Sequence, residues 1–300
     1  MKKILFAAAI ALVLCSQAES GAQVKKGGIS ERMLEEISKG YEGTASNKAI
    51  RNALGQTSIT VLARNAENAA MIDTHFSDRV ATKGITDQKS SGRCWLFSGL
   101  NVLRAKMIDR FDLGEFSFSQ NYLFFYDQLE KANLFLQGVI DTRALGFDDR
   151  KVDWLFQNPI GDGGQFTGVA NLITKYGLVP ADAMPETLCS NSTSAMSTQL
   201  ATLLRQGGLK LRDLSASGAK ESRLLEEKTA ILKDVYHILA ICLGVPPQDF
   251  EWARYDSKGN FVSKKTYTPK EFYQEFVSSD LENNYIMVMN DPTREYGKVY

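Results

Sequence analysis

The sequence of 300 residues is long enough for one large domain or two of ordinary size. Hydrophobic residues make up 44% of it and charged residues 23%, a globular composition that excludes a disordered or collagen-like chain. The formal net charge is zero, so no chain-wide basic excess favours nucleic acid. Two histidines, and four cysteines without a Cys-x-x-Cys pair, argue against a histidine-rich metal site and against zinc ribbons and fingers.

The start of the chain has the pattern of a secretory signal peptide. Lys2 and Lys3 precede an unbroken apolar run from Ile4 to Leu14, which is too short to span a bilayer. Two small-x-small cleavage sites follow it. We therefore predict that residues 1–22 are removed, that residues 23–300 form the mature domain without an integral membrane segment, and that the protein is periplasmic or secreted.

The cysteines bear on the compartment as well. A lipid anchor on Cys15 is disfavoured, because Leu14 stands where such signals require a small residue. The mature chain keeps Cys94, Cys189 and Cys242, so at least one thiol stays free or pairs between chains. Export permits a disulfide between Cys189 and Cys242, whereas the apolar surroundings of Cys242 favour a buried free thiol. The sequence leaves both possibilities open.

Helical signals dominate the first two thirds of the chain. Ser30 precedes a short apolar pattern that predicts one helix, and residues 47–71 predict little more than helix and turn pieces. A stronger pattern begins near Cys94 and predicts a helix with one buried stripe. The stripe consists of Leu96, Leu100, Leu103 and Met107.

Further helices are predicted behind this one. Ser119 has the position of an N-cap, and Tyr122, Tyr126 and Leu129 form the stripe that follows it. A turn-rich loop over residues 159–164 leads into a helix over 165–176. A long helix is expected from 221 to 243. Its predicted apolar face consists of Ile231, Val235, Ile238 and Cys242.

Strand signals begin only near the end of the chain. Residues 250–255 and 261–267 flank a turn sequence and predict a hairpin. Thr268 and Glu271 then form a capping box for a short helix. Residues Tyr285 to Met289 are predicted to form another strand. These patterns imply an α+β fold whose C-terminal β part is truncated.

One segment, from Gly84 to Ser98, carries recognisable chemistry. It places Cys94 in the first turn of an amphipathic helix, where unpaired N–H groups and the helix dipole favour an anion. A thiolate at this position is a good nucleophile. The backbone N–H of Cys94 and the side-chain amide of Gln88, six residues earlier, could stabilise an oxyanion beside the sulfur. Gly92 allows backbone to approach closely.

Plainer interpretations exist for these residues. A lone cysteine in a helix is usually a buried packing residue, but here the glutamine, its spacing, Ser-Gly before and Cys-Trp-x-Phe-Ser after coincide. Residues 161–164 could be a simple surface turn, and no Gly-Lys-Ser/Thr follows to make them a phosphate loop.

The segment around Cys94 resembles the papain-like cysteine peptidases, and more closely their bleomycin hydrolase and aminopeptidase C branch. That branch has Ser-Gly-Arg-Cys-Trp where ordinary members have a second cysteine nearby. The resemblance extends from about Ile29 to Tyr300. Other segments that carry it are Phe116–Phe125, Asn158–Phe166, Ile241–Pro247 and Asn290–Pro292.

The resemblance implies a papain-like cysteine peptidase fold and specific roles. Cys94 would be the nucleophile and Gln88 the oxyanion-hole donor. Gly163 and Gly164 would line the cleft and pair with extended substrate backbone. Trp95 would pack behind the cysteine.

A catalytic histidine and asparagine are not found in the sequence. His75 precedes the nucleophile in a polar stretch and is expected on the surface. His237, 143 residues after Cys94, lies in a predicted helix, whereas the family's histidine lies on a strand. On the aminopeptidase C pattern both groups would fall beyond Tyr300. We therefore expect a fragment of a longer enzyme or an inactive derivative, poorly soluble and inactive as 300 residues alone.

The leading hypothesis is an exported cysteine aminopeptidase that hydrolyses N-terminal peptide bonds through an acyl-enzyme. It requires no metal or other cofactor, and its partners are peptide substrates and, by resemblance, five further copies in a homohexamer. A papain-like endopeptidase, or a non-enzymatic assembly protein that lacks the base, remains the alternative. No basic cluster supports nucleic-acid binding.

Overall fold

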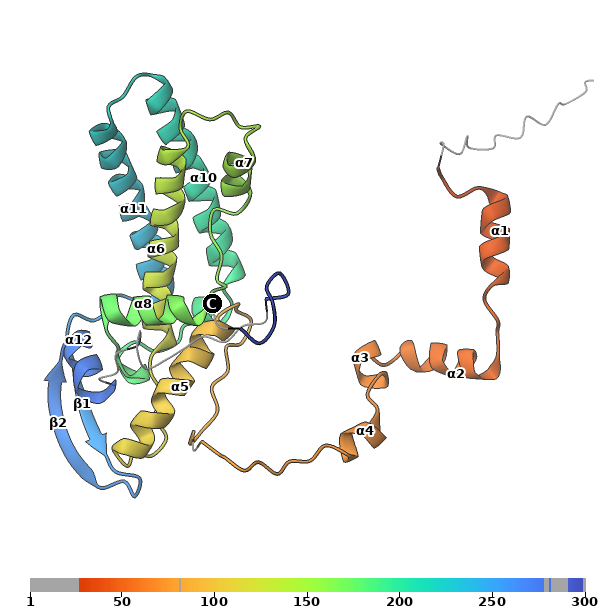
Figure 1. Cartoon of the computed structure of the whole chain (residues 1–300), viewed down its shortest axis with the longest axis horizontal. Coiled ribbons are helices and arrows are strands. Elements are labelled where there is room, and N and C mark those ends of the chain that lie inside the picture. Colours follow the sequence, from red (N-terminus) through yellow and green to blue (C-terminus); the bar gives the residue numbers. More distant parts are fainter. Residues whose placement is uncertain (1–26, 81, 278–280, 282–290, 299–300) are drawn as a thin grey trace, which may run out of the picture. The chain divides into compact units, whose positions relative to one another are not determined.

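The computed structural model describes residues 27–80, 82–277, 281 and 291–298. The chain divides into two compact units, Met1–Ser77 and Asp78–Tyr300. Helices make up most of the described residues, and the two strands lie near the C-terminal end of the chain (Figure 1). None of the described helices is both long and apolar enough to cross a membrane.

The described part of the first unit, residues 27–77, contains short helices with little burial. They are α1 (Glu31–Lys39), α2 (Ala45–Leu54), α3 (Ile59–Leu62) and α4 (Ala66–Ala70). The predicted helix after Ser30 is confirmed, and its N-cap hydroxyl accepts a hydrogen bond from the Met33 N–H at 3.2 Å. Within described residues 27–77, none of these helices buries a side chain.

The second unit contains the hydrophobic core. In chain order its elements are α5 (Cys94–Arg110), α6 (Gln120–Asp141), α7 (Arg150–Gln157), α8 (Phe166–Tyr176), the 3₁₀ turn η1 (Ala181–Ala183), α9 (Leu188–Asn191), α10 (Ser194–Ala216), α11 (Glu221–Leu243), β1 (Phe250–Tyr255), β2 (Phe261–Tyr267), α12 (Pro269–Phe272) and the π-helical turn η2 (Tyr273–Val277). The predicted stripe of α5 is confirmed, because all four of its members are buried.

Three long helices, α6, α10 and α11, run side by side (Figure 1). The sequence analysis does not predict helix α10, because Gly207 and Gly208 weaken its helical propensity. In the fold these glycines permit close packing. A Cβ at Gly207 would lie 2.9 Å from Ile231 of α11, and one at Gly208 would lie 3.1 Å from Phe135 of α6.

The predicted face of α11 needs a correction. Ile231 and Val235 are buried as expected, but Leu239 and Leu243 continue the buried row, while Ile238 and Cys242 are only half-buried. Residues four apart lie almost above one another on a helix, so the row 231, 235, 239 and 243 faces α6 and α10.

The hairpin is found at its predicted boundaries. Strands β1 and β2 pair antiparallel, with Phe250 opposite Tyr267. Thr268 caps α12 as expected, and a cluster of aromatic rings joins these elements to α5, with Trp252 and Phe111 at 4.9 and 5.0 Å from the ring of Phe276. The predicted strand at 285–289 lies outside the described residues.

Gly177 ends α8 as predicted, and its backbone explains why glycine is needed. Its φ is +82°, and an added Cβ would lie 2.3 Å from the Pro269 carbonyl carbon. The next residue, Leu178, donates its N–H to the Pro269 carbonyl at 2.9 Å. The turn therefore brings the start of α12 directly against the end of α8.

Candidate active site

Helix α5 begins at Cys94, whose side chain is exposed. Its N-cap, Arg93, makes no side-chain capping bond. The Arg93 carbonyl accepts the N–H groups of Leu96 and Phe97, each at 3.0 Å. The N–H groups of Cys94 and Trp95 come before these intrahelical bonds, at the positive end of the helix dipole. An exposed sulfur therefore lies where the backbone favours negative charge.

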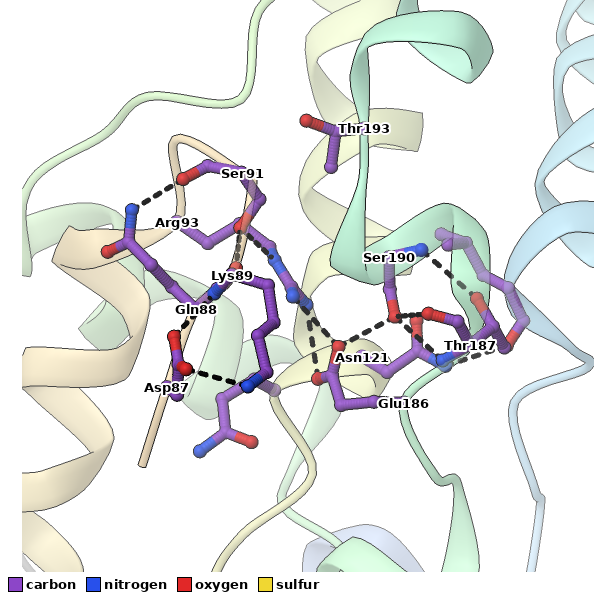
Figure 2. A network of polar contacts seen from close by, with 12 residues as sticks. Asp87, Gln88, Lys89, Ser91, Arg93, Asn121, Glu186, Thr187, Ser190 and Thr193 are labelled. Carbon is purple, nitrogen blue, oxygen red and sulfur yellow. Dashed lines mark hydrogen bonds and ion pairs between the residues drawn. The ribbon is translucent and has the colours of Figure 1, made fainter. Parts of the chain in front are cut away.

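The Arg93 side chain turns inward instead of capping the helix. It is fully buried, and its two terminal nitrogens donate to both carboxylate oxygens of Glu186 at 3.1 and 2.8 Å (Figure 2). Its Nε donates to the Ser91 hydroxyl at 3.0 Å. The rings of Phe97 and Phe124 lie 5.0 and 5.2 Å from the guanidinium carbon. This bidentate pair fixes the backbone directly before Cys94.

Glu186 is held in turn by helix α9. The Ser190 hydroxyl donates to the Glu186 carboxylate at 2.6 Å, while Thr187 and Ser190 form a capping box (Figure 2). The buried amide of Asn121 donates to the carbonyls of Pro185 and Leu243, both at 2.7 Å. These contacts attach the segment before α9 to both α6 and the end of α11.

Gln88 lies on a tight loop before the cysteine. Its side-chain amide donates to the Ser91 carbonyl at 2.5 Å, and the Ser91 hydroxyl donates to the Gln88 carbonyl at 2.6 Å (Figure 2). Lys89 has a φ of 54°, and the Asp87 carboxylate accepts both its N–H and its ammonium group. Ser90 extends the loop into a short parallel bridge with Ser192. The loop is thus ordered by its own polar groups and by its bridge to the segment after α9.

The glycine loop reaches the nucleophile helix through Asp162. Its carboxylate accepts the Gly92 N–H at 2.6 Å and the Thr193 hydroxyl at 2.7 Å, and its carbonyl accepts the Trp95 indole N–H at 2.8 Å. Burial raises the pKa of Asp162, but the hydrogen bonds from Gly92 and Thr193, together with smaller contributions that include the charge of Lys131, hold the pKa below its ordinary value. The carboxylate therefore joins three segments in its ionised form.

The two predicted cleft glycines have different surroundings. A Cβ at Gly164 would lie 2.6 Å from the Trp95 ring, so the indole packs directly on that backbone. A Cβ at Gly163 would meet nothing within 4 Å. Trp95 is buried directly behind Cys94, which agrees with its predicted packing role. The structure thus brings Gly163 and Gly164 to the helix that bears the cysteine.

Lys131 of α6 organises the same loop. Its ammonium group donates to the carbonyls of Gly163 and Gly161 at 2.6 and 3.0 Å, and pairs with Asp127 at 2.7 Å. It also lies 5.4 Å from the centre of the Trp95 ring. Burial raises the pKa of Asp127, and the ion pair with Lys131 offsets only part of that effect. Both residues are missing from the sequence-based site.

Neither histidine belongs to this polar network. His75 is exposed in a loop of the first unit, as expected. His237 is exposed on α11, which confirms that it lies on a helix. The network built above from described residues supplies a nucleophile, backbone donors and an ordered glycine loop, and it contains no imidazole.

An exposed cysteine at the start of a long buried helix, packed through a tryptophan on a glycine loop, is the arrangement expected for a papain-like cysteine peptidase. The chain belongs to the Peptidase C1-like family, whose model matches residues 28–300. This confirms the resemblance and the helix-rich papain-like fold.

Two relatives and one solved structure illustrate the similarity. Aminopeptidase C of Lactobacillus delbrueckii subsp. lactis is 39% identical over 86% of this chain and 57% of its own length. Aminopeptidase C of Streptococcus thermophilus is 36% identical over 91% of this chain and 61% of its own length. The crystal structure of PepW from Lactobacillus rhamnosis matches with a TM-score of 0.79 and 33% identity, over 86% of this chain and 58% of PepW. The chain therefore spans about three fifths of these proteins.

Proposed function

We propose that this chain carries the nucleophile of a cysteine aminopeptidase. The observation that carries the proposal is the exposed Cys94 at the open N-terminus of α5, held by the buried pair of Arg93 and Glu186. Relatives named Aminopeptidase C, G and E support the class of reaction. The substrate is then a peptide with a free amino terminus.

The proposed reaction is acyl transfer in two steps. The Cys94 thiolate attacks the carbonyl carbon of the first peptide bond and forms a thioester, and the remainder of the peptide leaves as an amine after it takes up a proton. Water then cleaves the thioester, which releases the amino acid and restores the thiol. A base must take the proton from the thiol. Among the residues that the structure describes, the polar network around Cys94 does not contain that base.

The remaining residues have supporting roles in this proposal. The N–H of Cys94 and the Gln88 amide would bind the oxyanion. One amide hydrogen of Gln88 is engaged by the Ser91 carbonyl, and a primary amide has a second one to donate. The open space beside Gly163 suits an extended substrate backbone, while Gly164 holds the loop on Trp95.

The test is hydrolysis of amino-acid anilides by the natural protein. We expect cleavage of substrates with a free α-amino group and none of their N-acetylated counterparts. Cys94→Ala should lower the rate by at least about 10³-fold. The matched control is Cys242→Ser, which removes another thiol and should retain activity when both proteins are assayed with a reducing agent present. Equal cleavage of N-acetylated peptides would instead support the endopeptidase alternative.

A non-catalytic assembly role is the second candidate, because the network contains no imidazole from the described part of the chain. It predicts that Cys94 reacts slowly with iodoacetamide at pH 6, since only a thiolate is alkylated readily. Rapid alkylation at that pH, absent in Cys94→Ser, would exclude this role. Slow alkylation together with no hydrolysis would exclude the aminopeptidase proposal.

We also propose export and self-association. The N-terminal sequence supports removal of residues 1–22, which lie outside the described part of the chain, and a mature domain from residue 23. N-terminal sequencing of the protein from its periplasmic or secreted fraction tests this, and an intact Met1 would contradict it. A homohexamer is proposed by resemblance, and light scattering that gives a monomer would contradict it.

A further inference from the structure

Two cysteines outside the candidate active site lie beside each other. Cys189 is on α9 and Cys242 is in the last turn of α11, 53 residues later. Both side chains are half-buried and pack against the hydrophobic core. Helix α9 packs against α11 at this point. Burial raises the pKa of the Cys242 thiol, and the neighbouring Cys189 thiol raises it further. Both are free thiols in the structure.

The backbones that carry these thiols are already held together. The Thr187 hydroxyl donates to the carbonyl of Cys242 itself at 2.8 Å. The buried amide of Asn121 bridges the carbonyls of Pro185 and Leu243, at 2.7 Å each. The chain on either side of both cysteines is thus fixed by hydrogen bonds. Little ordering cost remains for a covalent link between them.

We propose that Cys189 and Cys242 form an intramolecular disulfide that joins α9 to the end of α11. In this reaction one thiolate attacks a small disulfide such as oxidised glutathione, and one glutathione leaves as its thiolate. The second protein thiolate then displaces the other glutathione. The two cysteines lose two electrons and two protons, and oxidised glutathione is reduced to two molecules of glutathione.

The link would act on the segment that supports Cys94. Helix α9 contributes Ser190, which orients Glu186 against the buried Arg93. The Asn191 carbonyl at its end accepts the Ser90 N–H at 2.9 Å. Both contacts lead to the backbone directly before the nucleophile. The disulfide therefore stabilises the support of the active-site loop without using Cys94.

The experiment is disulfide mapping of the natural protein. It is incubated at pH 8 with oxidised glutathione, quenched, alkylated with iodoacetamide in denaturant without reductant, digested and analysed by mass spectrometry. We expect a peptide pair linked through Cys189 and Cys242, with Cys94 alkylated. The oxidised protein should melt roughly 5–10 °C above the reduced one.

Matched variants separate this link from other thiol chemistry. Cys94→Ser should form the same linked peptides. Cys189→Ser and Cys242→Ser should form no linked peptides, and each should have the same melting temperature after oxidation as after reduction. Alkylation of both Cys189 and Cys242 after oxidation would overturn the proposal. A link to Cys94, a link between two chains, or glutathione retained on either cysteine would overturn it as well. None of these readouts depends on peptidase activity.

Discussion

Helices α1 and α5 begin in opposite ways. In α1 the Ser30 hydroxyl occupies a backbone N–H at the helix start, and the helix buries no residue. In α5 no side chain caps the start, and more than half of the helix is buried. Its N-cap residue, Arg93, pairs with Glu186 in the core instead.

The difference shows where the support for a functional helix start comes from. A local cap stabilises an exposed helix but occupies the N–H groups that could bind an anion. At α5 the contacts of Arg93 and Asp162 hold the same turn from outside the helix. The N–H groups beside Cys94 then remain available to an anion, but the first turn of the helix depends on residues distant in the sequence.

The largest effect is expected from breaking the external support of α5. Glu186→Ala leaves the fully buried Arg93 without its carboxylate, and we expect the free energy of unfolding to fall by about 3–5 kcal/mol in urea denaturation. The control is Glu251→Ala, which breaks an exposed pair with Lys264 and should change stability little. Equal losses in the two variants would contradict the importance of the buried pair.

The next largest change in stability is expected from a substitution in the glycine loop, where two neighbouring glycines can be compared. Gly164→Ala places a methyl group 2.6 Å from the Trp95 ring, and we expect a loss of about 1–3 kcal/mol because the indole must move. Gly163→Ala meets open space and should be close to neutral in thermal unfolding. The prediction fails if both variants are equally stable.

Removal of an N-cap serine should cost more stability at a buried helix start than at an exposed one. The Ser119 hydroxyl accepts the Tyr122 N–H and donates to the Met184 carbonyl, so Ser119→Ala should cost about 2 kcal/mol of global stability. Ser30→Ala should cost about 0.5–1 kcal/mol, visible as faster hydrogen exchange within α1 alone. A global loss from Ser30→Ala would refute the contrast.

The smallest effect concerns pH. Because the pKa of folded Asp162 lies below its ordinary value of 3.8, its ionised form contributes stability that is complete above that value and is lost as pH falls through the lower folded pKa. Asp162→Asn should therefore show a shallower loss of stability from pH 5 to pH 2. Thr193→Val, which removes one donor, should give an intermediate slope. Identical slopes would exclude Asp162 as the cause.

Most of the fold follows from local sequence signals. The α5 stripe, the hairpin of β1 and β2 and the cap of α12 are all predictable, because periodicity, turn residues and capping boxes act over a few residues. Helix α10 is not predictable in this way. Gly207 and Gly208 lower its intrinsic propensity, and the close packing on Ile231 and Phe135 that compensates for them is visible only in the fold.

By itself the sequence determined the family, the cysteine at a helix start and the loop of Gly163 and Gly164, because each depends on residue types at short spacing. The tertiary structure decided which groups support them. Arg93 meets Glu186 across 93 residues and Gly92 meets Asp162 across 70. Such pairs produce no periodic pattern in the sequence, since their energy comes from burial and charge pairing that exist only after the chain has folded.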